Sequence, residues 1–119
     1  MREFLDRVVS YRKNIIPIIH DARQPKTYEG IYGTVDIIYS DIAQPDQTNI
    51  AIANCERYLK KDGIFFMVIK TRSINVIKNP RQVVDEEIKK LKKKFEIIQI
   101  INLEPFDKDH FMVVAMFNR

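Results

Sequence analysis

The stretch VDIIYSDIAQPDQ, residues 35–47, decides the fold that the sequence predicts. Its first six residues are rich in β-branched side chains and too few for a convincing helix, so they predict a buried strand. Two carboxylates, a proline and two amides follow where this strand ends. Residues 46–61 then predict a helix, because Ile52, Cys55 and Leu59 recur on one helical face. A strand that passes through a polar turn into a helix indicates one unit of an open α/β sheet, in which ligands bind beyond the carboxyl ends of the strands.

The chain on either side of this unit continues the alternation of strands and helices. Further strands are predicted over residues 14–19, 63–70, 95–103 and 110–117, and further helices over residues 2–13 and 79–95. Asn79 is the expected N-cap of the last helix, with Pro80 at its first position, and Gly63 is the expected stop of the helix before it. The predicted fold class is therefore α/β, an open and mostly parallel sheet with an antiparallel last strand and helices on both faces.

Length, charge and cysteine content limit the class of protein. The 119 residues fit one domain with a real core, and the longest apolar run, residues 64–69, is far too short to span a membrane. The first residues carry charges in place of an apolar run, so no secretory signal is expected. The single cysteine, Cys55, excludes an internal disulfide and suits a reducing compartment. A net charge of +4 favours an anionic partner without identifying nucleic acid.

Charged residues end three of the predicted strands at one edge of the sheet. Asp21, Asp41 and Lys70 each stand where one of the first three predicted strands ends. Three such residues of mixed sign leave two interpretations about equally open. They form a binding or catalytic site, or they are the ordinary placement of charges where strands emerge. On the residues alone, Asp41 could instead cap the next helix, and Lys70 could be a solvated strand end.

Three other features have ordinary structural interpretations. His110 precedes the apolar run FMVVAMF, which by itself favours a partly buried structural histidine. Cys55 lies on an apolar helical face and is expected in the core. Lys89, Lys90 and Lys92–Lys94 favour a solvated helix face, with contact to phosphate groups as the alternative that salt dependence would test.

Four segments, taken together, resemble one family. IIPIIHDARQP, VDIIYSDIAQPDQ, GIFFMVIKTRSI and LEPFDKDHFMVVAMF resemble, in order and spacing, the carboxyl-terminal part of archaeal fibrillarin, and the resemblance covers essentially the whole chain. Fibrillarin is the ribose 2′-O-methyltransferase of box C/D guide-RNA particles. The resemblance implies a class I (Rossmann-like) methyltransferase fold that uses S-adenosylmethionine on rRNA or tRNA, with guide RNA, a Nop5-type scaffold protein and an L7Ae-type protein as partners. It also implies the cytoplasm in an archaeon, or the nucleolus in a eukaryote.

The resemblance assigns catalytic roles to three residues. Asp41, Lys70 and His110 match the last three members of the family's Lys-Asp-Lys-His set, whose first lysine falls in a segment that this chain lacks. Methyl transfer from a sulfonium to a 2′-hydroxyl is an in-line displacement, so it depends strongly on positioning. An amine that a carboxylate orients stabilises the alkoxide that develops, which is the chemistry expected of Lys70 beside Asp41.

The resemblance also assigns residues to the cofactor. Asp21 and Ala22 match the corner that recognises adenine, where a carboxylate accepts a hydrogen bond from the exocyclic amine. The stretch that matches the lining of the cofactor pocket comprises Asp41, Ile42, Ala43 and Gln44. No metal site is expected.

The chain departs from the family pattern in one respect. It lacks the amino-terminal domain, the first two strands of the sheet and the glycine-rich cofactor loop, since its only glycines are Gly30, Gly33 and Gly63. We therefore expect one truncated methyltransferase domain over residues 1–119 that binds S-adenosylmethionine weakly and is inactive alone. The preferred interpretation is a fragment or short form of the RNA 2′-O-methyltransferase. The alternative is a non-catalytic module that binds the box C/D particle or complements a missing half.

One of the two strands that the chain lacks would have been the neighbour of the strand predicted over residues 14–19. That strand is expected to pair with residues 35–40 in a compacted five-stranded sheet, to pair with another chain, or to stay detached. An unpaired apolar edge promotes association, so a homo-oligomer is slightly preferred.

Overall fold

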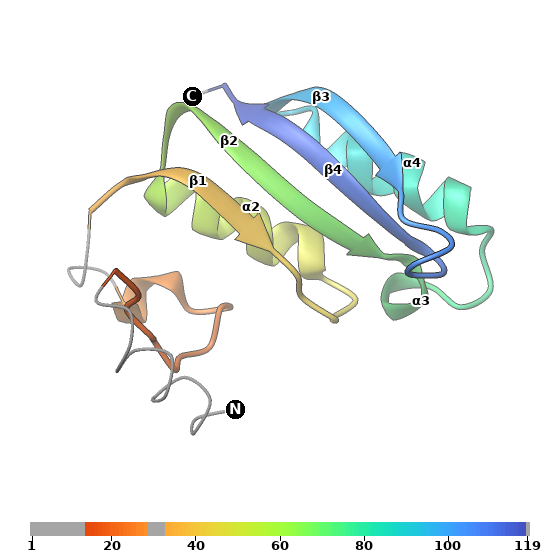
Figure 1. The fold of residues 1–119 in the computed structure, drawn as a ribbon, viewed down its shortest axis with the longest axis horizontal. Coiled ribbons are helices and arrows are strands. Elements are labelled where there is room, and N and C mark those ends of the chain that lie inside the picture. Colours follow the sequence, from red (N-terminus) through yellow and green to blue (C-terminus); the bar gives the residue numbers. More distant parts are fainter. Residues whose placement is uncertain (1–13, 29–32, 119) are drawn as a thin grey trace.

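The computed structural model describes residues 14–28 and 33–118, and Figure 1 shows its ribbon. In these residues the chain forms the 3-10 helix η1 (Pro25–Tyr28), β1 (Val35–Ser40), α2 (Gln47–Tyr58), β2 (Leu59–Lys70), α3 (Thr71–Ile74), α4 (Pro80–Leu91), β3 (Phe95–Asn102) and β4 (His110–Phe117). The predicted order of strands and helices after residue 34 is confirmed, with the short α3 added. The helix predicted over residues 2–13 lies outside the described residues. None of the helices in the described part of the chain is long and apolar enough to cross a membrane.

The sheet has four strands in the order β1-β2-β4-β3 (Figure 1). β1 runs parallel to β2, whereas β4 is antiparallel to both of its neighbours, β2 and β3. The last strand therefore inserts between β2 and β3. This arrangement confirms the predicted α/β fold with an antiparallel last strand, and it brings the carboxyl ends of β1 and β2 to one edge of the sheet.

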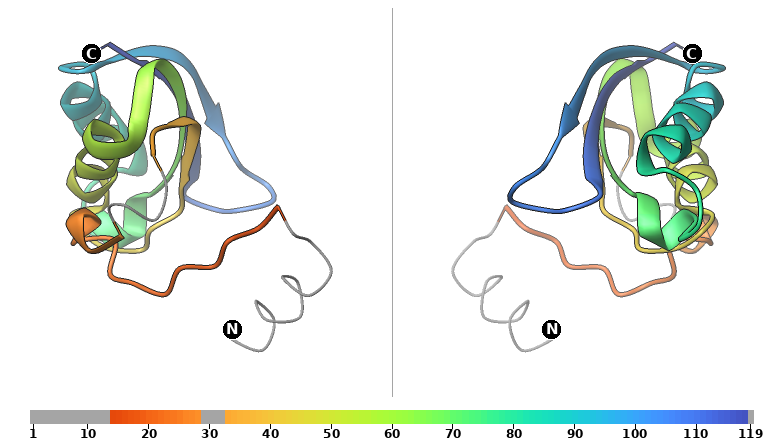
Figure 2. Two further views of the ribbon diagram at one scale, coloured as in Figure 1. Left: turned by 90° about the vertical axis from the view of Figure 1, so that its left-hand side faces the viewer. Right: turned by 90° about the vertical axis from the view of Figure 1, so that its right-hand side faces the viewer.

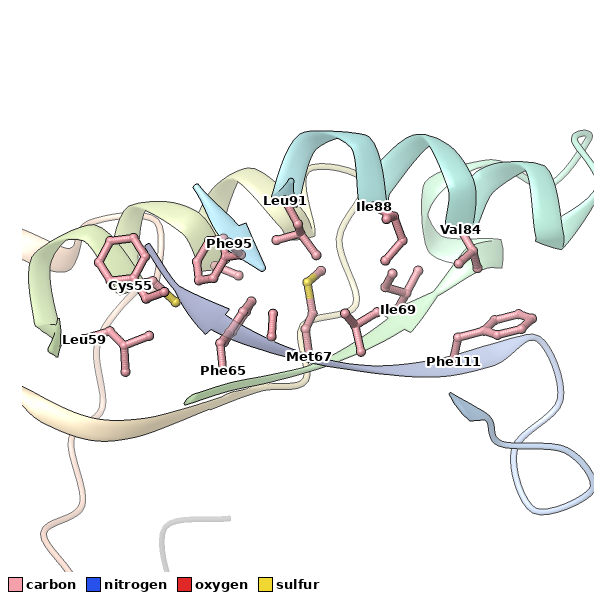
Figure 3. Close-up of a cluster of buried hydrophobic side chains, with 14 residues drawn as sticks. Cys55, Leu59, Phe65, Met67, Ile69, Val84, Ile88, Leu91, Phe95 and Phe111 are labelled. Carbon is pink, nitrogen blue, oxygen red and sulfur yellow. The ribbon is translucent and has the colours of Figure 1, made fainter. Parts of the chain in front are cut away.

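One face of the sheet carries the hydrophobic core. α2 and α4 pack on this face, as Figure 2 shows. Alternate side chains of β2, Phe65, Met67 and Ile69, are at most 1% exposed and point toward the two helices (Figure 3). Cys55 of α2 and Leu91 of α4 are fully buried in the same cluster, so the expected place of Cys55 in the core is confirmed. Burial of each large apolar side chain contributes about 1.5–3 kcal/mol relative to its exposed state, and this face therefore holds the fold together.

The opposite face of the sheet is open in the described residues. Ile37 and Tyr39 of β1 are each 59% exposed, and Ile98 of β3 is 55% exposed. These side chains alternate with neighbours that pack against the core, so they point away from α2 and α4. Within the described part of the chain, the helices expected on both faces are therefore found on one face.

Residues 14–19, predicted as a strand, form no strand. Pro17 has no backbone N–H to donate to a strand partner. Ile16 and Ile19 are each 65% exposed, so this apolar run is not buried either. The expected five-stranded sheet is therefore wrong, because this segment pairs with no strand of its own chain among the described residues. Pairing with another chain stays a prediction.

The helix that follows β1 is shorter than predicted. α2 ends at Tyr58, and Leu59 already has the extended conformation that begins β2, with φ −82° and ψ 131°. Leu59 is fully buried, so the strand conformation places it in the core. Asp62, and not Gly63, takes a left-handed conformation, with φ 62°. A Cβ at Gly63 would lie 2.8 Å from the backbone oxygen of Lys60 and 2.6 Å from Leu59 Cδ1, so this glycine is needed for space and does not stop the helix.

The start of α4 is as predicted, whereas its end is not. Asn79 Oδ1 accepts a hydrogen bond from Arg81 N at 2.9 Å, and Pro80 is the first helical residue. The helix ends at Leu91, before the predicted end, because Phe95 already begins β3. α3 is absent from the sequence prediction because four residues are too few to show a helical period.

Candidate functional site

The carboxyl ends of β1 and β2 bring an acid and an amine together. Asp41 directly follows β1 and Lys70 is the last residue of β2, and these strands are parallel neighbours. Lys70 Nζ lies 2.7 Å from Asp41 Oδ1, and the two side chains are 22% and 46% exposed, respectively. The ammonium group is thus partly shielded from water while the carboxylate fixes its direction. This arrangement suits the stabilisation of a negative charge that develops during a reaction.

A buried glutamine holds the end of β2 next to the turn that follows β1. Gln47 is the first residue of α2 and is only 1% exposed. Its Oε1 accepts a hydrogen bond from Lys70 N at 3.0 Å, and its Nε2 donates to Gln44 O at 2.8 Å. The two ends of the side-chain amide therefore tie the end of β2 to the turn that follows β1. This role was not predicted, and its only signal in the sequence is an amide at the first helical position after the strand.

The structure does not support the two ordinary interpretations, that Asp41 caps the next helix and that Lys70 is a solvated strand end. The N-cap residue of α2 is Asp46, so Asp41 does not cap that helix. Asp46 itself makes no capping hydrogen bond through its side chain, which is bonded to Arg23 instead. Lys70 is not a solvated strand end, because its side chain is mostly shielded and bonded to Asp41.

His110, on β4, lies directly opposite Lys70 on the neighbouring strand β2. The two residues are Cα partners in the antiparallel pairing of β2 with β4, so their side chains emerge on the same face of the sheet. The His110 side chain is 31% exposed, and its Nδ1 is 3.9 Å from Asp107 Oδ1. The structure thus brings Asp41, Lys70 and His110 to one edge of the sheet.

The residue before His110 fixes where β4 begins. Asp109 has a left-handed backbone with φ 61°, which aspartate tolerates better than most residues. Its carbonyl oxygen accepts hydrogen bonds from Thr71 N at 3.1 Å and from Thr71 Oγ1 at 2.9 Å. Its carboxylate accepts from Arg72 Nε at 3.2 Å. The loop before β4 is therefore tied to α3, directly after Lys70.

The corner formed by residues 21–24 is fastened to the start of α2. Asp21 Oδ1 accepts a hydrogen bond from Arg23 N at 2.9 Å. Arg23 Nη2 donates to Asp46 Oδ1 at 2.9 Å and to Gln44 Oε1 at 3.1 Å. The hydrogen bond from Arg23 lowers the pKa of Asp46 from its usual value, and the same bond raises the pKa of Arg23. These roles of Arg23 and Asp46 were not predicted, because nothing local in the sequence shows that the two residues meet.

A cavity of about 420 Å³ lies between this corner and β1. Its walls are mainly apolar and include Ile18 and Ile38. Ser40, also on the wall, is 8% exposed, and its Oγ has no hydrogen-bond partner among the described residues. Asn54 Nδ2, at another wall, donates to Ala22 O at 2.9 Å. The cavity therefore offers mainly apolar walls with a few polar atoms among them.

The residues predicted to bind the cofactor divide into two equal sets. One set lines the cavity and comprises Ala22, Asp41 and Ile42. The other set is exposed and lies outside the lining, and it comprises Asp21, Ala43 and Gln44. The glycines of the described residues, Gly33 and Gly63, do not line the cavity, so these residues offer no glycine-rich loop for the methionine end. No group of His, Cys, Asp and Glu side chains in the described ranges is placed to hold a metal ion.

Comparisons with known proteins agree with this fold. The family model for fibrillarin matches residues 1–119. The fibrillarin-like rRNA/tRNA 2′-O-methyltransferase of Sulfurisphaera tokodaii is 48% identical over 118 residues, which are 98% of this chain and 50% of that protein. The structure of a fibrillarin/Nop5p complex matches with a TM-score of 0.94 and 38% identity, over 98% of this chain and 56% of that one. Aeropyrum pernix fibrillarin with natively bound S-adenosyl-L-methionine matches with a TM-score of 0.83 and 42% identity, over 96% of this chain and 50% of that one.

The fold and these matches define first a class and then a family. The sheet, with its parallel β1–β2 pair and its inserted antiparallel strand, is that of a class I, Rossmann-like methyltransferase. The chain belongs to the fibrillarin family, which confirms the resemblance found in the sequence. It spans about half the length of the relatives that it matches.

Proposed function

We propose that this chain takes part in the 2′-O-methylation of ribose in rRNA or tRNA, with S-adenosylmethionine as the methyl donor. The observation that carries the proposal is the pair of Lys70 Nζ and Asp41 Oδ1, 2.7 Å apart, with Asp41 also on the wall of a mainly apolar cavity. The name of the Sulfurisphaera tokodaii relative supports the reaction and its RNA substrates. The cofactor bound to Aeropyrum pernix fibrillarin supports the methyl donor.

Lys70 is the residue that we expect to act on the sugar hydroxyl. A ribose 2′-hydroxyl is a weak nucleophile at neutral pH, and its oxygen becomes more negative as it attacks. An ammonium group has three N–H donors. At Lys70 the Nζ is bonded to Asp41 Oδ1, which leaves the remaining donors for the sugar oxygen. When bound, S-adenosylmethionine would supply an electrophilic methyl group, whose bond to sulfur breaks as the bond to the ribose oxygen forms, and the hydroxyl proton passes to water. The residues that would hold its adenine end are Ala22, Asp41 and Ile42.

We further propose that this chain binds S-adenosylmethionine weakly when it is alone, and is then inactive. The mainly apolar cavity is where we place the adenine end, whereas the described residues provide no glycine-rich backbone for the methionine end. Titration calorimetry of the isolated chain should therefore give a dissociation constant well above the low-micromolar range. A low-micromolar constant for the isolated chain would contradict this part of the proposal.

A Nop5-type scaffold protein, guide RNA and an L7Ae-type protein are the partners that we propose for the active particle. The fibrillarin/Nop5p complex supports the first of these, because the chain shares the fold of a fibrillarin that assembles with that protein. Guide RNA would select the ribose by base pairing, and the L7Ae-type protein would join through the particle.

A second candidate function is a non-catalytic module that completes another polypeptide or binds the box C/D particle. The open face of the sheet favours it, since Ile37 and Tyr39 are each 59% exposed. Within the described residues, β1 is also an edge strand with β2 as its one neighbour. A second copy of the chain would cover the same face in a homo-oligomer.

A methyl-transfer assay in a reconstituted particle separates the two candidates. The chain is combined with a Nop5-type protein, an L7Ae-type protein, a guide RNA and its complementary target RNA. The mixture is tested with and without a separate polypeptide that corresponds to the part of the relatives that the chain does not match. Labelled methyl incorporation at the guided ribose in the complete mixture, and its loss with Lys70→Met, would support the proposed activity. No incorporation in the complete mixture would favour the non-catalytic module.

A further inference from the structure

The corner formed by residues 21–24 takes no support from strand pairing in the described part of the chain. Residues 14–19, which lead into it, form no strand, and β1 is the first strand of the sheet. The 3-10 helix η1, which follows the corner, packs against α2 (Figure 2). The position of the corner beside the cavity therefore depends on contacts outside the sheet, and α2 is the element that makes them.

Asn54 of α2 makes the central contact to this corner. Its Nδ2 donates to Ala22 O and to Ile50 O, both at 2.9 Å. An amide nitrogen carries two hydrogens, so both are used. The bond to Ile50 O, one turn back on the same helix, fixes the direction of the side chain, and the bond to Ala22 O holds the corner. This nitrogen can therefore act on a ligand only through Ala22.

Two further contacts join α2 to the chain around the corner. Tyr58 Oη, one turn further along the helix, donates to Pro25 O. At the start of the helix, Arg23 Nη2 donates to Asp46 Oδ1 at 2.9 Å. The Arg23–Asp46 pair is half exposed, and exposed ion pairs contribute little in water. The bond from Asn54 to Ala22 O is partly buried, so water competes with it less.

The same helix also holds the end of the strand that carries the proposed catalytic amine. Gln47, the first residue of α2, accepts a hydrogen bond from Lys70 N. Asn54 and Ala22 both line the cavity in which we place the adenine end of S-adenosylmethionine. One rigid helix therefore sets the position of a ligand at the corner relative to Lys70, and methyl transfer depends on such positioning.

We propose that Asn54 is a cofactor-positioning residue, which holds the corner at Ala22 in place so that the adenine end meets an ordered wall. The inference rests on the proposed function, because it takes S-adenosylmethionine as the ligand of the cavity. Since the corner is ordered before the ligand arrives, less conformational entropy is lost on binding. Asn54 takes no part in proton or methyl transfer.

The amide NMR spectrum of the chain tests the contact without any ligand. Asn54→Asp keeps the shape of the side chain and removes the donor, since an ionised carboxyl group only accepts hydrogen bonds. Asn49→Asp is the matched control, because it makes the same change at an exposed position of the same helix. The amide nitrogen resonance of Arg23, whose peptide group contains Ala22 O, should move in Asn54→Asp and in Asn54→Ala. It should stay in place in Asn49→Asp.

Binding of adenosine tests the consequence for the ligand. Adenosine carries the adenine end of the cofactor and lacks the methionine end, for which the described residues offer no glycine-rich loop. NMR titration should show about 3- to 10-fold weaker binding for Asn54→Asp and Asn54→Ala, the range expected from the loss of one hydrogen bond. Asn49→Asp should stay within about twofold of the wild type.

Kinetics in the complete methyl-transfer mixture separates positioning from a general loss of structure. Asn54→Asp should raise the KM for S-adenosylmethionine about 3- to 10-fold and leave kcat within about twofold. The KM for the target RNA should not change. A variant that only loosened the fold would lower kcat, or the fraction of folded chain, instead.

Two outcomes would overturn the role of Asn54 and leave the proposed function standing. One is an unchanged Arg23 resonance in both Asn54 variants. The other is an affinity for adenosine equal to that of the wild type in both variants. Failure of the wild type to bind adenosine would also overturn the inference, and the methyl-transfer assay would then decide the proposed function independently.

Discussion

Asp41 Oδ1 and Lys70 Nζ meet at 2.7 Å because β1 and β2 are parallel neighbours that end at the same edge of the sheet. The same two strands carry a second acid and amine at their other end, where Lys60 Nζ lies 3.0 Å from Asp36 Oδ1. The second pair is more exposed, with side chains 51% and 81% accessible for Lys60 and Asp36. The two pairs therefore allow a matched test of whether position and shielding, and not charge alone, give Lys70 its proposed role.

Lys70→Met should lower guided methyl transfer about 100-fold or more in the reconstituted particle, because it removes the group that faces the developing negative charge. Lys60→Met should leave the rate within about twofold, and each variant should change the free energy of unfolding by no more than about 1 kcal/mol. Label incorporation and urea unfolding measure the two quantities. Similar rate losses in both variants would contradict a special role for Lys70.

Gln47→Ala should lower the free energy of unfolding by about 1–3 kcal/mol, because it leaves Lys70 N without its hydrogen-bond acceptor at a site where Gln47 is 1% exposed. Gln82→Ala, at an exposed position of α4, is the control and should stay within about 0.5 kcal/mol of the wild type. Urea unfolding compares the variants. Equal stability of the two variants would show that the buried amide is not needed to hold the end of β2.

Asp109→Ala should destabilise the chain by about 1–2 kcal/mol, because alanine tolerates the left-handed backbone at φ 61° poorly and cannot bond to Arg72. Asp109→Asn should cost less, since asparagine accepts this conformation. Thermal unfolding of the two variants measures the difference. If asparagine destabilised the chain as much as alanine, the ion pair to Arg72, and not the backbone conformation, would account for the loss.

Burial raises the pKa of the Cys55 thiol to about 12. In the unfolded chain a thiol loses its proton near pH 8.5 or so, hence the folded state binds more protons than the unfolded state between about pH 8.5 and 12. The contribution of Cys55 to stability should therefore be complete below that range and fall as the pH rises through it. Urea unfolding of the wild type and of Cys55→Ala at several pH values would show the difference in slope.

The same burial should protect the thiol from reagents. Iodoacetamide should modify Cys55 slowly in the native chain and rapidly in urea, since the thiolate is the reactive form. Alkylation of the native chain at the rate of a free cysteine would contradict the buried position.

Tyr39→Lys should reduce self-association, because Tyr39 is 59% exposed on the open face of the sheet and lies on its edge strand. Val76→Lys, which changes an equally apolar side chain that is 68% exposed in a loop, is the control and should have little effect. Size-exclusion chromatography with light scattering measures the mass of each variant over a range of concentrations. A wild type that stays monomeric throughout would contradict the proposed homo-oligomer.

Local pattern accounts for the elements that formed as predicted, and it fails where an element depends on contacts with distant residues. The apolar period of α4, its cap at Asn79 and the apolar run of β2 are local features, and both elements formed there, although α4 ends earlier and β2 begins earlier than predicted. Residues 14–19 carry an equally apolar run and formed no strand, since a strand also needs a neighbour and Pro17 weakens the pairing. Gly63 was predicted to stop the helix, whereas the structure needs a glycine there because Leu59 and the backbone oxygen of Lys60 come too close for a side chain.

The sequence by itself determined the strand and helix types after residue 34, the family, and the placement of Asp41, Lys70 and His110 at the ends of strands. Only the tertiary structure decided which side chains meet there and what holds them. The bond from Lys70 N to Gln47 and the bond from Arg23 to Asp46 each join residues 23 positions apart. Contacts at such separations leave no periodic trace in the sequence, because they depend on how parallel strands and the helix between them pack in space.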